Sequence, residues 1–312
     1  MKLFKPSFWD EKQVSVYSII LFPISLILQI LISIKKKIIK TKNFPIPIIC
    51  VGNIYLGGTG KTPLCIELHK ILKKLGKKPV FVRKKYKHYI DEKKLLEQFD
   101  NVYENNNRAD AIHDAVKNEF ETVIMDDGFQ DFSIKKDFSI VCFNQKQWIG
   151  NGLTIPSGPL RESLNALNRA DCVMINGKKN VAIEKKILEK NKEIKIFYTK
   201  YIIENINNFK NKKTICFAGI GNPENFFDLL ILNGVNIHEK IKFPDHYNFT
   251  KKDLDSLIKK SRENSAILLT TEKDYLRIDN EFRKNINFIK IKLEIENEDN
   301  LIENIKKLYE NN

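Results

Sequence analysis

The chain has 312 residues, 42% apolar and 29% charged, which is ordinary globular usage and excludes a wholly disordered, collagen-like or disulfide-stapled chain. Its 53 basic and 39 acidic residues give a net charge of +14, which favours an anionic partner such as phosphate, anionic lipid or nucleic acid without choosing among them. The five scattered cysteines are typical of buried thiols in a reducing compartment.

The first predicted element is an apolar helix over residues 14–34, which carry no charge and are followed by Lys35, Lys36 and Lys37. Its polar residues fall on one stripe at helical spacing; they are Ser15, Ser18, Ser25, Gln29 and Ser33. A sided apolar helix with a basic end can lie in a membrane interface, span the bilayer or pack on the protein's own core. We favour the interface, with the lysines on the cytoplasmic side.

From residue 46 the pattern changes to alternating strands and helices. Short apolar runs predict strands at 46–53, 78–84, 121–129, 138–144 and 170–178, and helical spacing predicts helices at 62–76 and 108–118. This alternation predicts an α/β fold of the P-loop NTPase type, a doubly wound parallel sheet with ligands at the carboxyl edge of its strands.

A second, smaller α/β lobe is predicted after the Lys- and Asn-rich stretch at 179–192. It contains a connecting strand at 195–203, a strand, glycine turn and helix at 214–234, strands at 266–274 and 286–295, and a final helix from 301. The expected domains are a membrane-associating helix at 1–45, a nucleotide-binding lobe at 46–192, and the connecting strand with the second lobe at 193–312.

A glycine-rich loop between a strand and a helix carries the strongest chemical signal. It consists of Tyr55, Leu56, Gly57, Gly58, Thr59, Gly60, Lys61 and Thr62. Glycines let backbone N–H groups converge on phosphates, the lysine neutralises them, and the threonine can ligate Mg²⁺. Tyr55 stands where the usual pattern has glycine. Nucleotide binding is favoured over a plain tight turn.

Two adjacent carboxylates, Asp126 and Asp127, follow the apolar run TVIM. The carboxyl end of a buried strand is where a carboxylate meets the magnesium of a bound nucleotide. A polar strand end is the alternative, and the nearby phosphate loop makes it the weaker one. The sequence therefore predicts a site for ATP and Mg²⁺.

Six ordered blocks make the chain similar to a known family. They are GNIYLGGTGKTP (52–63), MDDGFQDFSIKKDFSIVCF (125–143), GNGLTIPSGPLRESLNALNRAD (150–171), FAGIGNPENFF (217–227), FPDHYNFT (243–250) and LLTTEKDYLRI (268–278). Together they resemble the tetraacyldisaccharide 4′-kinase family, the membrane-associated lipid A 4′-kinases of Gram-negative bacteria.

The resemblance implies transfer of the γ-phosphate of ATP to the 4′-hydroxyl of a tetraacyldisaccharide 1-phosphate. It places the protein at the cytoplasmic face of the inner membrane, as a peripheral or monotopic protein in contact with anionic lipid. Neither nucleic acid nor an obligate protein partner is expected, since no nucleic-acid recognition motif accompanies the charge.

The resemblance also implies roles for individual residues. Asp91 in IDEKK matches the family's base for the acceptor hydroxyl, and His246 in PDHYNF matches its orienting partner. Arg161 in SGPLRES is a candidate contact to substrate phosphate, with a salt-bridged loop residue as the alternative. The chain departs from the family's Ser-Arg-Gly-Tyr-Gly run, with RKKYK at 83–87, and has a short stretch from there to Asp91.

Two other classes of function remain open from the residues alone. A soluble P-loop kinase or ATPase acting on a non-lipid substrate would need the phosphate loop but not the apolar helix. A non-catalytic nucleotide switch would bind a partner through its basic surface and form no phosphorylated product.

Overall fold

The computed structural model describes residues 6–11, 13–85 and 90–310. The chain divides into two compact units. The large unit holds the described residues up to 85 together with 100–200 and 294–310, and the small unit holds 90–99 and 201–293.

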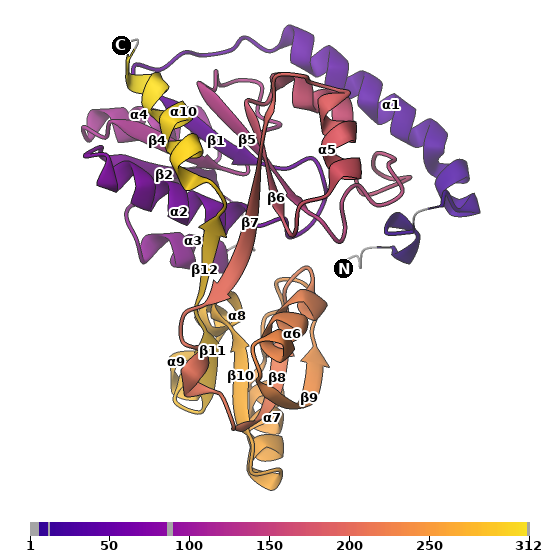
Figure 1. Ribbon diagram of the computed structural model, residues 1–312, viewed down its shortest axis with the longest axis vertical. Helices are drawn as coiled ribbons and strands as arrows, with labels where there is room; N and C mark the ends of the chain where they lie inside the picture. Colours follow the sequence, from indigo (N-terminus) through magenta and orange to yellow (C-terminus); the bar gives the residue numbers. More distant parts are fainter. Residues whose placement is uncertain (1–5, 12, 86–89, 311–312) are drawn as a thin grey trace. The chain divides into compact units, whose positions relative to one another are not determined.

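The large unit contains an eight-stranded sheet in the order β12-β7-β6-β5-β1-β4-β2-β3 (Figure 1). The strands are β1 (Ile48–Gly52), β2 (Pro79–Lys84), β3 (Val102–Asn105), β4 (Thr122–Asp126), β5 (Phe138–Asn144), β6 (Cys172–Asn176), β7 (Lys195–Ile203) and β12 (Ile291–Ile295). All pairings from β3 to β7 are parallel. The loops after β1 and β4 therefore leave the same edge of the sheet.

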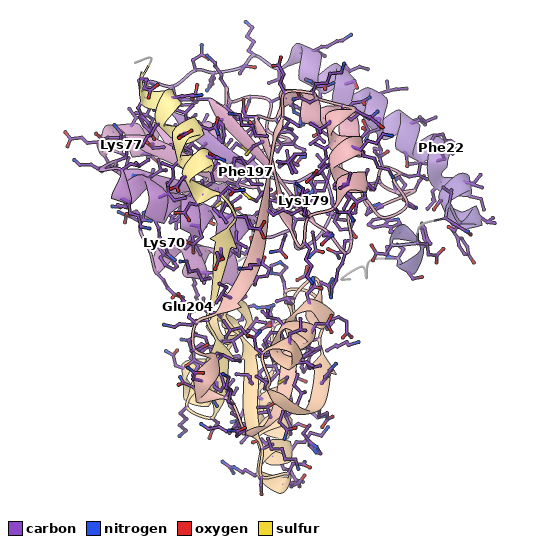
Figure 2. The ribbon with its side chains drawn as sticks, in the orientation of Figure 1. Phe22, Lys70, Lys77, Lys179, Phe197 and Glu204 are labelled. Carbon is purple, nitrogen blue, oxygen red and sulfur yellow. The ribbon has the colours of Figure 1, made fainter. Side chains whose placement is uncertain are left out.

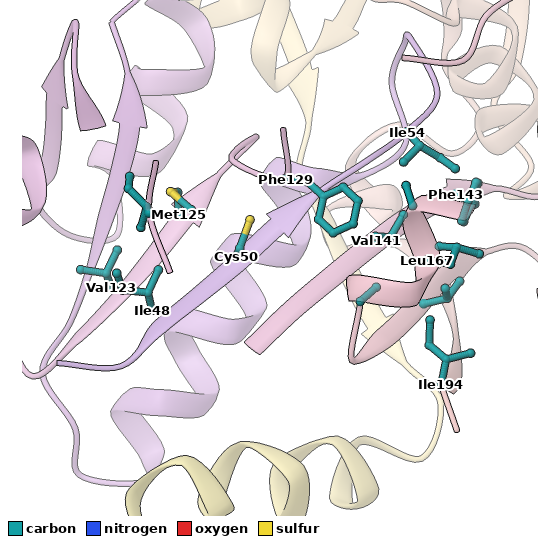
Figure 3. Close-up of a cluster of buried hydrophobic side chains, with 14 of the residues drawn as sticks. Ile48, Cys50, Ile54, Val123, Met125, Phe129, Val141, Phe143, Leu167 and Ile194 are labelled. Carbon is teal, nitrogen blue, oxygen red and sulfur yellow. The ribbon is translucent and has the colours of Figure 1, made fainter. Parts of the chain in front are cut away.

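The centre of this sheet is buried over the whole length of β1, β4 and β5. Ile48 and Cys50 of β1 pack in one cluster with Val123 and Met125 of β4 and Val141 of β5 (Figure 3). Continuous apolar runs of this kind are typical of parallel strands covered on both faces. The predicted doubly wound sheet is confirmed.

Helices and short 3₁₀ turns complete the large unit. They are η1 (Ser7–Trp9), α1 (Val16–Ile38), α2 (Lys61–Lys74), α4 (Arg108–Lys117), η2 (Leu164–Arg169), α5 (Val181–Leu188) and α10 (Glu298–Glu310). The sequence analysis missed α5, which begins where the Asn180 side chain accepts hydrogen bonds from two backbone N–H groups. Its Ile183 and Ile187 are buried among lysines that face solvent.

The predicted apolar helix, α1, turns Ser18, Ser25 and Gln29 of its polar stripe toward the large unit and most of its apolar side chains outward. Ser18 and Ser25 are 0% and 1% exposed. Leu21 and Ile32 are half-buried. The other large apolar residues of the helix are 37% to 73% exposed; they are Val16, Tyr17, Ile19, Ile20, Phe22, Ile24, Leu26, Ile27, Leu28, Ile30, Leu31, Ile34 and Ile38. Phe22 lies on the outer flank (Figure 2). Only 11% of the most apolar window is buried, so α1 is not a core helix.

The small unit has its own four-stranded sheet in the order β11-β10-β8-β9, with every pairing parallel. The elements are α3 (Ile90–Glu97), η3 (Ile206–Asn208), β8 (Lys213–Ala218), α6 (Pro223–Leu232), β9 (Asn236–Lys242), α7 (Lys251–Glu263), β10 (Ile267–Thr271), α8 (Glu272–Arg277), α9 (Asn280–Arg283) and β11 (Ile286–Ile289). Alternate residues of β8 serve two cores, with Cys216 in one and Ile215 in the other.

The unit boundaries differ from the expected 1–45, 46–192 and 193–312 in four ways. Residues 193–200 lie in the large unit, where β7 pairs with β6. The N-terminal helix belongs to the large unit, because its buried serines bond to that unit. Residues 90–99 belong to the small unit, where Lys94 of α3 donates to the Leu276 carbonyl of α8. Residues 294–310 return to the large unit, because β12 joins its sheet edge and Tyr309 of α10 bonds to Thr122 of β4.

Candidate functional site

The glycine-rich loop connects β1 to the first turn of α2, at the carboxyl edge of the sheet. Gly57 and Gly60 have φ of +148° and +91°, where a side chain would be strained. The Asn53 amide fixes the loop from inside by donating to the Gly57 carbonyl (3.2 Å) and the Thr59 hydroxyl (3.0 Å). Because Gly60 is the N-cap, no side chain caps α2, and the N–H groups of its first turn are available to an anion.

Tyr55, which replaces the usual glycine of the motif, is 0% exposed. Its hydroxyl donates to Asp10 Oδ1 at 2.5 Å. Burial, and then the bond to this carboxylate, raise the pKa of Tyr55 above its ordinary range. The side chain therefore anchors the loop, and only the backbone of Tyr55 contributes to the phosphate loop.

The predicted polar side chains meet at the same edge. Lys61 Nζ lies 3.7 Å from Asp127 Oδ1, and the Thr62 hydroxyl donates to Asp126 Oδ2 at 3.5 Å. Asp126 is 2% exposed at the end of β4. Asp127 follows with φ +53°, a left-handed conformation that occurs mostly in turns and functional sites.

Arg161 lies beside the same carboxylate. Its Nη1 donates to Asp127 Oδ1 at 2.9 Å and to Gln130 Oε1 at 3.3 Å. Arg108, at the start of α4, donates from Nη2 to the Asp127 carbonyl at 2.7 Å and pairs with Asp131 at 3.0 Å. The sequence analysis missed Arg108, because nothing in a helix-starting arginine indicates a partner 19 residues away.

The side-chain oxygens of Thr62, Asp126 and Asp127 fit a Mg²⁺ ion that is also bound by phosphate oxygens. Hard oxygen ligands are its preferred donors, and it is commonly held by one or two carboxylates together with phosphate oxygens. Within the described ranges there is no group of three or more His, Cys, Asp or Glu residues that could hold a metal on its own. The donor set fits a cation that arrives with a nucleotide.

The second predicted cluster lies within the small unit. Asp91, in the first turn of α3, is 1% exposed. Its Oδ1 lies 3.2 Å from His246 Nδ1, and since an ionised carboxylate can only accept, Nδ1–H is the donor. His246 has φ +52° and its N–H donates to the Gly219 carbonyl at 2.9 Å. The family pattern thus identified a real pair whose members are 155 residues apart in sequence.

Two buried residues of α8, Asp274 and Arg277, lie beside the Asp91–His246 pair. Asp274 is 0% exposed, accepts a hydrogen bond from Gly219 N–H and pairs with Arg277. Arg277 donates to the Gly219 and Tyr247 carbonyls at 2.8 and 3.1 Å. It thereby holds the carbonyl that accepts the His246 N–H and the carbonyl of the residue that follows His246. Burial raises the pKa of Asp274. Both residues lie in the block LLTTEKDYLRI, but no local pattern marks them as partners of Asp91 and His246.

The pKa of Asp91 is lowered by this environment. Burial alone would raise it, but the hydrogen bond from His246 and the charges of Lys273, His246 and Arg277 outweigh burial. Arg277 Nε lies 3.8 Å from Asp91 Oδ2. Apart from this ion pair, that oxygen has no hydrogen-bond partner among the described residues, so it is the oxygen of the carboxylate that can still accept a hydrogen bond. Of the unusual RKKYK run, Tyr86 and Lys87 lie outside the described residues.

Comparisons with known proteins agree with this geometry. A family model described as LpxK, tetraacyldisaccharide-1-P 4′-kinase, matches residues 17–96 and 85–310. Tetraacyldisaccharide 4′-kinase of Pelagibacter ubique is 44% identical over 315 residues, covering 100% of both chains. The Rickettsia felis protein of the same name is 33% identical and covers 98% of both. Crystalline LpxK of Aquifex aeolicus, in complex with ATP, has a TM-score of 0.72 at 25% identity, covering 93% of this chain and 99% of that one.

A parallel sheet whose first strand leads through a glycine-rich loop to a helix beginning with Lys61 and Thr62 defines a P-loop nucleotide-binding protein. The full-length matches narrow this class to phosphotransferases. The chain belongs to the tetraacyldisaccharide-1-phosphate 4′-kinase family, and the family expected from the six sequence blocks is confirmed.

Proposed function

We propose that this protein transfers the γ-phosphate of ATP to the 4′-hydroxyl of a tetraacyldisaccharide 1-phosphate, a step of lipid A biosynthesis. The observation that carries the proposal is that Lys61 lies beside Asp127 and Thr62 bonds to Asp126 at the end of the phosphate loop, in a chain similar to 4′-kinases over its whole length. A plain ATPase would share the loop but would have no use for a buried base and an outward apolar helix.

In this proposal the large unit handles ATP. Backbone N–H groups from Gly57 to Thr62 hold the β and γ phosphates, and Lys61 balances the charge that moves to the bridging oxygen. Arg161 belongs with them: a guanidinium has five N–H donors, so it can hold Asp127 and a phosphate oxygen at once. We assign it to phosphate rather than to a purely structural salt bridge.

Thr62, with Asp126 and Asp127, would hold Mg²⁺ together with phosphate oxygens. Such a cation, when bound, neutralises charge on the β and γ phosphates. Comparing Asp126→Asn with Asp127→Asn tests the assignment: the carboxylate that ligates the metal directly is the one whose loss raises the Mg²⁺ concentration needed for half-maximal rate.

Asp91 serves as the proton acceptor for the attacking hydroxyl. Its lowered pKa keeps it ionised at neutral pH, and Oδ2 is free to take the proton. His246 holds Oδ1, so the carboxylate presents one oxygen in a fixed direction. His246 is therefore a positioning residue for the base.

The outward apolar face of α1 supports a peripheral or monotopic position on the membrane that contains the lipid substrate. A spanning helix is less consistent with the contacts, because Ser18 and Ser25 bond to the loop at 150–157, and irregular backbone is not tolerated in lipid. Lys35, Lys36 and Lys37 in the last turn of α1 would bind anionic lipid at the cytoplasmic face. No obligate protein partner is part of the proposal.

The decisive experiment supplies purified protein with ATP, Mg²⁺ and a tetraacyldisaccharide 1-phosphate in micelles, and analyses the lipid by mass spectrometry. We expect a product heavier by one phosphoryl group, formed roughly 10²- to 10³-fold more slowly with Lys61→Ala. Hydrolysis of ATP without lipid phosphorylation would instead indicate an ATPase or a kinase for a non-lipid acceptor.

A further inference from the structure

Polar side chains of α1 form hydrogen bonds with one loop of the large unit, residues 150–161, which we call the bridging loop. The Ser25 hydroxyl donates to the Thr154 carbonyl at 2.9 Å and accepts the Ser157 N–H at 3.1 Å. It also lies 2.8 Å from the Ser157 hydroxyl. Both serines are almost fully buried, at 1% and 0% exposed, so these bonds are shielded from water.

Two more contacts extend this attachment along the helix. Asn151 Nδ2 donates to the Ser18 hydroxyl at 3.0 Å and to the Ser157 carbonyl at 2.9 Å. Gln29 Nε2 donates to the Arg161 carbonyl at 3.3 Å. The stripe therefore touches both ends of the bridging loop, including the residue whose side chain binds Asp127.

The opposite side of the bridging loop pairs with the phosphate loop. Leu56 N–H donates to the Pro159 carbonyl at 2.8 Å, and Arg161 N–H donates to the Ile54 carbonyl at 2.6 Å. Tyr55 and Leu160 between them form an antiparallel bridge. One short strip of backbone is thus bonded to α1 on one side and to the ATP site on the other.

A second link runs through the segment that precedes α1. Asp10 accepts the Tyr55 hydroxyl, and Trp9 Nε1 donates to the Pro156 carbonyl at 3.0 Å. Asn151 N–H donates to the Trp9 carbonyl at 2.9 Å. Residues on both sides of the start of α1 therefore reach the phosphate loop or its support.

We propose that Ser18, Ser25 and Gln29 are positioning residues for the ATP site, so that a lipid surface which holds α1 also orders the phosphate loop and Arg161. A surface bound to the apolar face restrains the helix, and the bonds on its polar face carry that restraint to Leu56 and Arg161. The inference rests on the proposed function and adds a regulation to it: the donor site is best ordered where the acceptor lipid is found.

The test uses full-length protein in detergent micelles and a fluorescent ATP analogue. Ser25→Ala removes the hydroxyl from under the bridging loop and leaves the Ser157 N–H buried without its acceptor. We expect the Kd of the analogue to rise roughly five- to thirtyfold. Ser33→Ala is the matched control, because Ser33 is exposed and, among the residues that the structure describes, its hydroxyl bonds within α1, to the Gln29 carbonyl. It should bind like wild type.

Both serine variants should still bind vesicles of phosphatidylethanolamine and phosphatidylglycerol, because the apolar face is intact. A folded Ser25→Ala protein that binds the analogue with wild-type affinity would overturn the inference. If Ser25→Ala does not fold, Gln29→Ala replaces it, since it removes a single 3.3 Å contact and should weaken nucleotide binding in the same direction by a smaller factor.

Hydrogen exchange of the wild-type protein gives an independent readout. Adding the same vesicles should slow exchange of the Leu56 and Arg161 amides, and unchanged exchange with the protein demonstrably bound would contradict the coupling. Failure of the proposed function looks different: wild-type protein would form no phosphorylated lipid, while these nucleotide-binding and exchange results would stand on their own.

Discussion

The two functional clusters are built in opposite ways. The phosphate loop is local: ten consecutive residues from Asn53 to Thr62, shaped by glycines and a helix N-terminus, present mainly backbone groups. The Asp91–His246 pair is non-local, assembled from α3 and a loop beyond β9 and held by the buried ion pair of Arg277 with Asp274. A backbone-built site tolerates sequence change around it, whereas a side-chain-built site depends on a few irreplaceable groups.

The sharpest test of this contrast is Asp91→Asn. It keeps the size of the side chain but removes the proton acceptor, so kcat should fall by roughly 10³-fold while the KM for ATP stays near wild type. Asp255→Asn, at an exposed aspartate of α7 in the same unit, is the control and should be silent. Steady-state kinetics at saturating lipid would measure kcat and the KM for ATP separately. A comparable loss of ATP affinity would contradict separate roles for the two clusters.

Lys61→Ala should lower kcat by roughly 10²- to 10³-fold and, unlike Asp91→Asn, should also weaken ATP binding. The lysine meets charge already present on bound ATP as well as charge that develops during transfer. Lys74→Ala, an exposed lysine in the last turn of the same helix, should change neither quantity. Near-normal turnover of the Lys61 variant would refute the phosphate-loop assignment.

His246→Ala should cost less, roughly tenfold in kcat, and should change the pH profile. The wild-type carboxyl has a lowered pKa, so its acid limb lies below the ordinary value of about 3.9. Without His246, two of the causes that lower the pKa of Asp91 are lost, so this pKa rises and the acid limb moves to higher pH. His238→Ala, at an exposed histidine of β9, should leave the profile in place.

His246→Ala should also change how the thermal stability of the protein depends on pH. A carboxyl with a lowered folded-state pKa contributes stability above its unfolded pKa, and that stability is lost as the pH falls through the folded-state pKa. Thermal melts of wild type should show this contribution from Asp91 fading in acid. In His246→Ala this contribution of Asp91 should be lost. If the melting temperatures of wild type and variant depended on pH in the same way, Asp91 and His246 would not be coupled.

The smallest effect on chemistry is expected outside both clusters. Ile27, on the outward face of α1, is 57% exposed. Ile27→Ser should reduce vesicle partitioning roughly ten- to hundredfold, since burial of one such side chain contributes about 1.5 to 3 kcal/mol. Turnover on lipid in detergent should be unchanged. Ile231→Ser, at a 49% exposed isoleucine of the small unit, should leave vesicle binding intact.

Sequence patterns predicted the elements whose cause is local. The apolar run 138–144 coincides with β5, and the helix predicted at 108–118 is α4. The patterns did not predict α3. Its sequence has four charged residues, DEKK, before the adjacent Leu95 and Leu96, so no apolar residues repeat at helical spacing there. The patterns also predicted one strand at 286–295 where the structure has two, β11 and β12. Lys290 belongs to neither strand, but the alternation of apolar residues continues across it.

The site divides in the same way. The phosphate loop and the aspartates after β4 follow from motif and position, whereas Asp91 and His246 could be named only from the family pattern. Arg108, Arg277 and Tyr55 acquire their roles through partners distant in sequence, so no local signal marks them. The direction of the α1 stripe was also unpredictable, since periodicity identifies two faces but not which one meets the protein.

The return of the chain to the large unit has a consequence for how the protein is made. The edge strand β12 begins as the small unit ends, and the helix α10, anchored through Tyr309 to Thr122 of β4, follows it. On the ribosome the small unit can complete its sheet first, while the ATP-binding unit waits for its last elements. Damage near the C-terminus, for instance loss of 298–310, would therefore harm the phosphate loop's own scaffold and spare the unit translated just before it.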